Sequence, residues 1–436
     1  MTHQPAHGAT LSRLPLLVFV AWRNLWRNPV RSGLTISALA GGLVMVILYS
    51  ALLEGMVDQM IASATERSTG HIQLHRQAFL DDRDLYATLP DDWTADLEEA
   101  INGIHTAPRL YAAGLASAQQ SSYGVMIQAV DPARERRVTR MLDQLRAGTA
   151  AIGQMSDDER PRHQVLIGAQ LARNMQLSPG SELVLVTQAA DGSIGNDLYR
   201  VAGILKPLSP DFDRSGVLMS VDAWRALMYL EEGVHELAVR LDRPDELTAT
   251  QQRIRERIDR QVAAAPLDEL GGPAVVRNWR EINPTVADML ALSQTMLLII
   301  GVIVIGLAAM GVLNTMLMAI HERTHEFGIL LAIGMKRRWL LAMVLCESFF
   351  LSLVAAAVGV AGGLGVVAWL GEDGIDFSGA LPDGYDWAGM VFEPVIPLHL
   401  VAGHVVDATL LLIAITLLAT LIPSWRLSRL TPAEVM

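Results

Sequence analysis

One short segment of the chain carries residue types that could do chemistry. His321, Glu322 and His325 follow the pattern His-Glu-x-x-His. On one helix, two imidazoles spaced this way share a face and can hold Zn²⁺, while the Glu polarises a bound water. Glu347, 22 residues after His325, is a candidate third ligand. A zinc metalloprotease is therefore one hypothesis, although so short a pattern depends on its structural context.

Nucleotide hydrolysis is a second chemistry to consider, and the sequence argues against it. Phosphate-binding loops combine a Gly-rich run with a Lys. Lys206 and Lys336 are the two lysines present, and neither follows such a run. His71 and His75 also point the same way on a predicted strand, and we expect them to be a solvent-facing pair. The single cysteine, Cys346, excludes an intrachain disulfide.

The rest of the chain must position these groups, and it is strongly apolar. Over the whole chain, 51% of the residues are hydrophobic and 18% are charged. Four stretches contain no Asp, Glu, Lys or Arg: Ser32–Leu53, Met289–Ile320, Ser348–Gly371 and Ala408–Trp425. Each is long enough to cross, or nearly cross, a bilayer core of about 30 Å. The sequence therefore predicts a membrane protein with four spans. A net charge of −12 argues against a nucleic-acid binder.

The charges of the polar segments predict the orientation. Segments 1–31, 321–338 and 426–436 together hold 10 Lys or Arg and three acidic residues. Segment 54–288 holds 24 basic and 35 acidic residues, and segment 372–407 holds seven acidic residues and no basic one. Because short cytoplasmic loops retain Lys and Arg, we expect both termini and loop 321–338 inside. The spans then occupy 32–53, 289–320, 339–371 and 408–425.

Smaller patterns complete the expected architecture. Within 1–31, Leu14 to Asn28 is typical of an amphipathic interfacial helix that ends at Pro29. The insertion 54–288 alternates strand-like and helix-like patterns, which predicts an α+β domain of two lobes between the first and second spans. The stretch 289–320 would reach about 48 Å as a helix, so we expect helical stalks leading into this domain. Gly33, Ser37 and Gly41 form a small-residue face that fits contact with a second subunit or packing within one chain.

The loop after the second predicted span resembles that of a known family. The pattern Glu322-Arg323-x-x-Glu326-x-Gly328-Ile329-Leu330-x-Ala332-x-Gly334 is similar to the coupling helix of FtsX-like, MacB-type ABC transporter permeases, including the lipoprotein-releasing subgroup. Phe327 and Leu331 depart from the usual residues. Glu347, the ending Ile422-Pro423-Ser424-x-Arg426-x-x-Arg429 and the outer segment Val165-Leu166-Ile167-Gly168 also resemble this family.

The resemblance implies a membrane all-α permease subunit with four transmembrane helices and a large periplasmic domain, located in the bacterial inner membrane. It implies two permease chains, identical or different, working with two cytoplasmic ABC ATPase chains that bind ATP and Mg²⁺; this chain itself needs no cofactor. Glu322, Arg323 and Glu326 would make charged contacts with the ATPase. Phe327, Leu330 and Leu331 would seat helix 322–334 on the ATPase by apolar contact, and Gly328 and Gly334 belong to the same coupling pattern.

The resemblance also implies what the transporter does. ATP-driven movement would pass through the stalks by mechanotransmission and release or export a lipoprotein or another amphiphile, with a periplasmic carrier or adaptor as a further candidate partner. Val44–Leu53 and Met289–Ile300 are candidate cargo surfaces near the outer leaflet. An alternative is a signalling permease that activates a periplasmic partner. The integral-membrane zinc protease is the remaining alternative.

Overall fold

The structure is a computed structural model that describes residues 14–118, 121–157, 160–268, 271–371, 374–379, 385–387, 390–392 and 394–427. The chain divides into two compact units. The helical unit comprises Met1–Val57, Leu290–Phe377 and Val395–Met436, and the sheet unit comprises Asp58–Met289 and Ser378–Pro394. The tail before Leu14 and the C-terminal family pattern from Ser428 onward lie outside the described residues.

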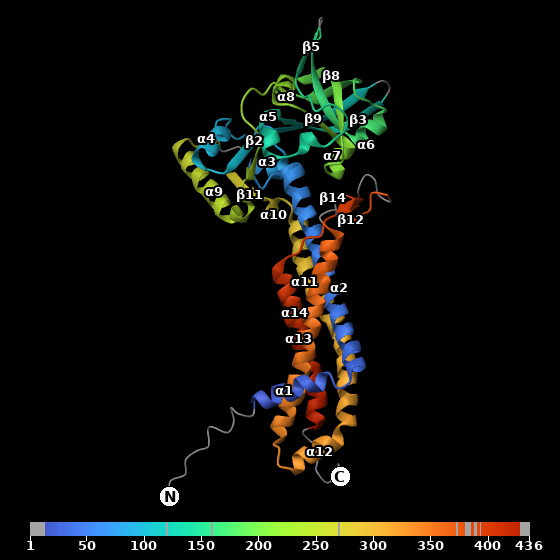
Figure 1. Ribbon diagram of the computed structural model, residues 1–436. Coiled ribbons are helices and arrows are strands. Elements are labelled where there is room, and N and C mark those ends of the chain that lie inside the picture. Colours follow the sequence, from blue (N-terminus) through green and yellow to red (C-terminus); the bar gives the residue numbers. More distant parts are fainter. Residues whose placement is uncertain are drawn as a thin grey trace. The chain divides into compact units, whose positions relative to one another are not determined.

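Within the described residues, four helices are long and apolar enough to cross a membrane. They are α2 (Pro29–Ala64), α11 (Pro284–Glu322), α13 (Arg337–Leu370) and α14 (Ala402–Leu427). Their apolar side chains form one shared core, and within the helical unit they run side by side (Figure 1). The predicted four-span arrangement is confirmed. At 36 and 39 residues, α2 and α11 are longer than the roughly 20 residues that a bilayer core requires.

Two shorter helices complete this unit. α1 (Leu14–Leu25) precedes α2, and α12 (Thr324–Ala332) lies between α11 and α13. Ala21 and Leu25 of α1 are buried, whereas Trp22 on this helix and Trp26 just after it are 43% and 48% exposed. α1 packs on α13, where the Trp22 ring lies 5.6 Å from the Phe350 ring. The position of this helix at the membrane interface stays a prediction.

The sheet unit is α+β, as predicted. Its strands are β1 (Ile72–Arg76), β2 (Ile104–Ala118), β3 (Ser121–Val130), β4 (Leu145–Gly148), β5 (Gln154–Asp157), β6 (Arg160–Gly168), β7 (Glu182–Gln188), β8 (Ile194–Leu205), β9 (Gly216–Ser220), β10 (Glu236–Leu241) and β11 (Ala274–Asn278). Its helices are α3 (Gln77–Asp82), α4 (Trp93–Ala100), α5 (Pro132–Val138), α6 (Ala169–Met175), α7 (Pro210–Ser215), α8 (Val221–Met228), α9 (Leu247–Ala264) and α10 (Trp279–Ile282).

All eleven of these strands belong to one mixed sheet. Nine follow the order β11-β1-β10-β2-β3-β9-β6-β8-β4; β5 pairs with β6, and β7 pairs with both β2 and β8. The two expected lobes are therefore joined by a continuous sheet. In the sequence, Glu182–Thr187 and Leu198–Leu205 flank the turn residues Asp191-Gly192 and predict a hairpin. The structure confirms it, because β7 and β8 pair antiparallel and Gly192 supplies the left-handed backbone (φ +83°) that their turn requires.

The core of the sheet unit explains one wrong prediction. β1 lies between β10 and β11, and all five of its residues are buried. His75 on this strand and His71 just before it are therefore buried rather than solvent-facing. The His71 ring accepts a hydrogen bond from the Leu241 N–H at 3.2 Å. The alternation along β1 misled the prediction, because an interior strand can be covered on both faces.

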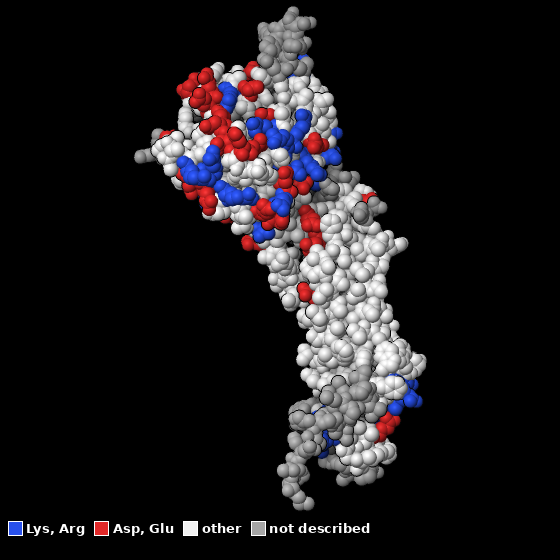
Figure 2. All heavy atoms as spheres, turned by 60° about the vertical axis from the view of Figure 1, so that its left-hand side comes forward, with Lys and Arg blue, Asp and Glu red and all other residues white. Residues whose placement is uncertain are grey.

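The segment between α13 and α14 contains short strands. β12 (Ile375–Asp376) pairs with β15 (Val395–Ile396), and β13 (Tyr385–Trp387) pairs with β14 (Met390–Phe392). Charged side chains are rare along the four long helices in the view of Figure 2, and they return at the end of the helical unit that carries α12. This end is where the sequence places the candidate chemistry.

Candidate functional site

The loop between α11 and α13 contains a short helix, α12, whose C-terminal end is capped. α11 ends at Glu322, Arg323 separates it from α12, and α12 ends at Ala332. Gly334 has a φ of +97°, and the N–H groups of Gly334 and Met335 donate at 3.0 Å to the carbonyls of Leu331 and Leu330. This is a Schellman motif, in which a left-handed Gly satisfies the last helical carbonyls. Gly334 thus stops the helix before the chain turns into α13.

One face of α12 packs inside the chain. The Phe327 side chain is only 1% exposed and contacts a small core with Leu340, Met343 and Val344 of α13. Leu330 and Leu331 pack against the edge of this core, and Gly328 is buried. The predicted seat of α12 on an ATPase therefore needs correction: in this structure Phe327 faces α13 and is not available to a partner.

The opposite face of α12 exposes apolar side chains that the sequence analysis did not single out. Ile329 is 46% exposed and Ile333 is 79% exposed. They are four residues apart, so they lie on one side of the helix. Because apolar residues surround the whole helix, its pattern did not reveal which of them face outward.

The charged residues of the loop are engaged within the chain. The Arg31 guanidinium donates to both carboxylate oxygens of Glu322 at 2.7 Å. The Arg27 guanidinium lies 3.2 Å from Glu326. The hydrogen bond that Arg27 donates to Glu326, together with the one from Arg323, holds the pKa of Glu326 below its ordinary value. The predicted contact residues Glu322 and Glu326 thus already have intrachain partners.

Arg323 is the most enclosed of the charged residues in this loop. Its guanidinium lies 3.2 Å from Glu326 and 3.2 Å from Glu347 of α13. It also covers the Phe327 ring, with the guanidinium carbon 5.3 Å from the ring centre. Arg323 therefore joins α12 to α13.

The zinc hypothesis loses its geometric basis here. His321 belongs to α11 and His325 to α12, so the two imidazoles do not share one helical face. Glu322 is paired with Arg31, and the candidate third ligand Glu347 is paired with Arg323. Among the described residues, no group of three His, Cys, Asp or Glu side chains is placed to hold a metal ion.

The small-residue face of α2 points away from the rest of the helical unit. Ser37 and Gly41 are exposed, and Gly33 is half-buried. A Cβ added at Gly33 or Gly41 would meet no atom within 4 Å. The sequence left two roles open for this face. The open space around both glycines shows that they do not serve close packing within the single chain.

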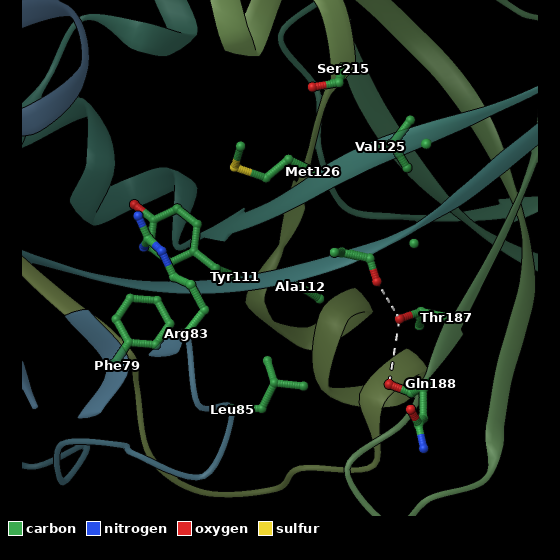
Figure 3. A pocket seen from close by; sticks show the side chains of 13 residues that line it. Phe79, Arg83, Leu85, Tyr111, Ala112, Val125, Met126, Thr187, Gln188 and Ser215 are labelled. Carbon is green, nitrogen blue, oxygen red and sulfur yellow. Dashed lines mark hydrogen bonds between the residues drawn. The ribbon is translucent and has the colours of Figure 1, made fainter. Parts of the chain in front are cut away.

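The sheet unit contains a mainly apolar recess of about 670 Å³ (Figure 3). Leu85, Met126 and the Phe79 ring line it, and the Arg83 guanidinium lies 5.2 Å from the centre of that ring. The Thr187 hydroxyl donates to the Ala113 carbonyl at 2.7 Å at the other end of the recess. The sequence analysis did not predict this recess, whose walls come from β2, β3 and β7 and from the chain around α3.

Two protein-domain families match two successive parts of the chain. Residues 32–257, just over half of the chain, match the MacB-like periplasmic core domain. Residues 298–432 match the FtsX-like permease C-terminal domain. The first match includes α2 and most of the sheet unit, and the second includes α12, α13 and α14.

Individual relatives agree with these matches. The lipoprotein-releasing system transmembrane protein LolC of Neisseria meningitidis is 22% identical over 423 residues, which cover 94% of this chain and 95% of that protein. The macrolide export ATP-binding/permease protein MacB of Bdellovibrio bacteriovorus is 22% identical over 360 residues, which cover 79% of this chain and 52% of that protein.

Among solved structures, the periplasmic region of MacB from Actinobacillus actinomycetemcomitans is similar to 52% of this chain and 95% of its own, with a TM-score of 0.34 and 11% identity. The sequence matches, the four apolar helices and their order around the inserted domain agree with the predicted resemblance. The chain belongs to the family of MacB-like, FtsX-like ABC transporter permeases.

Proposed function

We propose that this permease works with a separate ATPase chain and that α12 is the surface on which that ATPase acts. The observation that carries the proposal is the division of α12 into two faces. Phe327 fixes one face to α13, while Ile329 and Ile333 stand exposed on the other. A short helix that is anchored to a spanning helix and apolar on its free side is suited to receive a partner and pass its movement on.

The docking energy would come mainly from the two isoleucines. Burying an exposed Ile side chain stabilises a complex by about 1.5–3 kcal/mol. Glu326, whose side chain is half exposed, lies one turn before Ile329 and two turns before Ile333, and it can offer a charge to the partner while it remains paired with Arg27. We therefore expect an apolar cleft with a basic rim on the ATPase.

ATP and Mg²⁺ would bind to the partner. The sequence offers no Gly-rich loop before Lys206 or Lys336, and we propose that a separate polypeptide supplies the groups that hold nucleotide phosphates. The permease would then contribute movement without catalysis. The positive charge of segments 1–31 and 321–338 supports a cytoplasmic location for α12 and for both termini in the inner membrane.

A second permease chain would lie against the outward face of α2. Small residues allow two helices to approach closely in a membrane, where packing and not water exclusion drives association. Gly33, Ser37 and Gly41 provide such a face, and it remains open in the single chain. We propose a pair of permease chains, identical or related, joined along this stripe.

The cargo we propose is a lipoprotein or another amphiphile, moved by mechanotransmission. Apolar side chains near the outer end of α11, including Leu292, Leu298 and Ile299, are exposed, as is Met45 on α2. These positions belong to the predicted cargo surfaces. Such a surface can cover an acyl chain without a water-filled path, and the name of the LolC relative is consistent with this class of cargo.

The test is purification of the tagged full-length chain from its native cells in mild detergent, with identification of the co-purified proteins and assays of ATP hydrolysis and bound metal. An ABC ATPase together with a lipoprotein or a periplasmic carrier supports the proposal. A cell-wall hydrolase in place of cargo would favour the signalling alternative. Stoichiometric zinc with peptide cleavage and no ATPase would overturn the proposal.

A further inference from the structure

Charged side chains from several parts of the helical unit meet around the start of α12, whose place in this unit is shown in Figure 1. Arg27 comes from the link between α1 and α2, Arg31 from the first turn of α2 and Glu322 from the end of α11. Arg323 lies between α11 and α12, Glu326 belongs to α12 and Glu347 to α13. Three positive and three negative charges are present, so the cluster is neutral. Its four ion pairs connect elements that are up to 299 residues apart.

The Arg323–Glu347 pair is the enclosed part of this cluster. Both side chains are 12% exposed, and their nearest charged atoms are 3.2 Å apart. The pairs of Arg27 and Arg31 are more open, with side-chain exposures between 24% and 54%. Exposed pairs contribute little to stability, whereas losing one partner of an enclosed pair leaves a charge without compensation. The Arg323–Glu347 pair should therefore contribute most of the energy that holds the elements of this cluster together.

The position of Arg323 makes this pair mechanically useful. Arg323 is the single residue between α11 and α12, and its backbone leaves the ideal helical conformation (φ −101°, ψ 10°). The chain can therefore bend at this point. The same residue binds Glu347, one turn after Met343 and Val344, which pack against Phe327. The ion pair and the apolar contact hold α12 on the same stretch of α13.

A small hollow of about 60 Å³ lies beside the charges and is lined by polar residues that include Asn24, Asn28 and Thr315. A cavity of this size and polarity has room for water. Water near the pairs would weaken them compared with a dry interior, so that α12 is held firmly but can still be displaced.

We infer that Arg323 is a positioning residue that fixes α12 to α13 through Glu347, so that a push on α12 moves α13 directly and not only the end of α11. This inference rests on the proposed role of α12 as the ATPase contact. It assigns Arg323 and Glu347 a role in coupling that does not require either residue to touch the ATPase. Arg27 and Arg31 link the same point to α2.

The first experiment needs no ATPase. A spin label at Ala332→Cys, an exposed position on α12, is introduced into the full chain after Cys346→Ser, and the protein is placed in nanodiscs of phosphatidylethanolamine and phosphatidylglycerol. Arg323→Gln and Glu347→Gln should each increase label mobility. The double variant should be no more mobile than either single variant, because one broken pair cannot be broken twice. Arg338→Gln removes a loop charge outside the cluster and should change nothing.

The second experiment uses the complex with its co-purified ATPase. Arg323→Gln should lower cargo-stimulated kcat by about tenfold while ATPase co-elution and the KM for ATP stay unchanged, since coupling and not docking is lost. Unchanged or additive label mobility overturns the pair, and full stimulation despite a mobile α12 overturns the positioning role. If no ATPase accompanies the wild-type chain, the proposed function fails, and the spin-label comparison still decides whether the pair holds α12.

Discussion

Gly359 of α13 lies directly against Leu43 of α2: a Cβ added at Gly359 would be 2.9 Å from Leu43 Cδ2 and 3.1 Å from the Ala40 carbonyl oxygen. The backbone of Ala40 cannot yield as a flexible side chain could. We therefore predict that Gly359→Leu destabilises the helical unit by about 1–3 kcal/mol through overpacking. Thermal unfolding of the purified full-length chain would measure the loss, and an unchanged midpoint would contradict the close packing of α2 and α13.

Gly41 on α2 is the control for Gly359, because its surroundings are open. A Cβ there meets nothing within 4 Å, so Gly41→Leu should leave the unfolding midpoint of the single chain unchanged. It should weaken the association of two permease chains, because a large side chain keeps the helices apart. Crosslinking at Ser37→Cys in a Cys346→Ser background would report the association. Equal crosslinking with and without Gly41→Leu would show that the stripe faces lipid.

Ile333→Asp should separate the permease from its ATPase. The substitution places a charge on the most exposed apolar position of the proposed docking face, and burying it without a partner is costly. We expect loss of ATPase co-elution with normal membrane insertion. Ile333→Met keeps an apolar side chain and serves as the control. Co-elution that survives both Ile333→Asp and Ile329→Asp would place the docking surface elsewhere.

Glu322 and Glu326 test the charged part of the same site. Replacing both with Ala should abolish cargo-stimulated ATP hydrolysis and leave insertion intact, because the permease then offers the ATPase no carboxylate at this site and α12 also loses its ion pairs with Arg31 and Arg27. The lowered pKa of Glu326 keeps its carboxylate ionised at neutral pH and somewhat below. Stimulation should therefore not depend on this residue's titration near pH 7. Retained stimulation in the double variant would refute the assignment.

The sequence allowed the fold to be predicted where its signals are local. Four uncharged stretches identified the spans, and Asp191-Gly192 identified the β7–β8 hairpin. The pattern from Glu322 to Gly334 identified the loop. These features depend on hydropathy, turn chemistry and residues close together in the chain.

These local signals could not predict contacts between residues that are far apart in the chain. Arg27 pairs with a residue 299 positions away, and no local pattern indicates that partner. Phe327 was assigned to the wrong face because α12 is apolar on every side after its first turn, so that only the position of α13 decides which side is buried. His75 was misplaced for a similar reason, since neighbouring strands cover β1.

The buried charges of the sheet unit should be essential to its stability. Arg109 is bound to Glu135 at 2.6 Å and to Glu236 at 2.8 Å, and all three side chains are almost fully buried. Arg109→Met would leave two enclosed carboxylates without a cation, at a cost of about 3–5 kcal/mol. Hydrogen exchange of β2 and β10 peptides in the full chain should accelerate accordingly. Arg257→Met, which breaks the more exposed pair with Asp96, should have little effect.

His235 should make the sheet unit less stable in acid. Its Nε2 donates to the Leu85 carbonyl and its Nδ1 accepts from the Tyr111 N–H, both at 2.9 Å, so the ring is satisfied only when it is neutral. Burial is the largest cause that lowers the pKa of His235 from 6.5 to about 4; the positive charges that His75 and Arg83 can carry add to this, and the Leu85 carbonyl and Asp84 oppose it.

Because the folded pKa of His235 is below the unfolded one, its contribution is complete above pH 6.5 and is lost as the pH falls toward 4. Between pH 8 and pH 5 the loss should be about 2 kcal/mol. Hydrogen exchange of β2 and β10 peptides across this range would measure it, and His235→Gln should flatten the pH dependence. His105→Gln, at a half-exposed pair with Asp242, is the control. A slope that survives in His235→Gln would assign the acid sensitivity to other groups, beginning with His75, whose pKa burial also lowers.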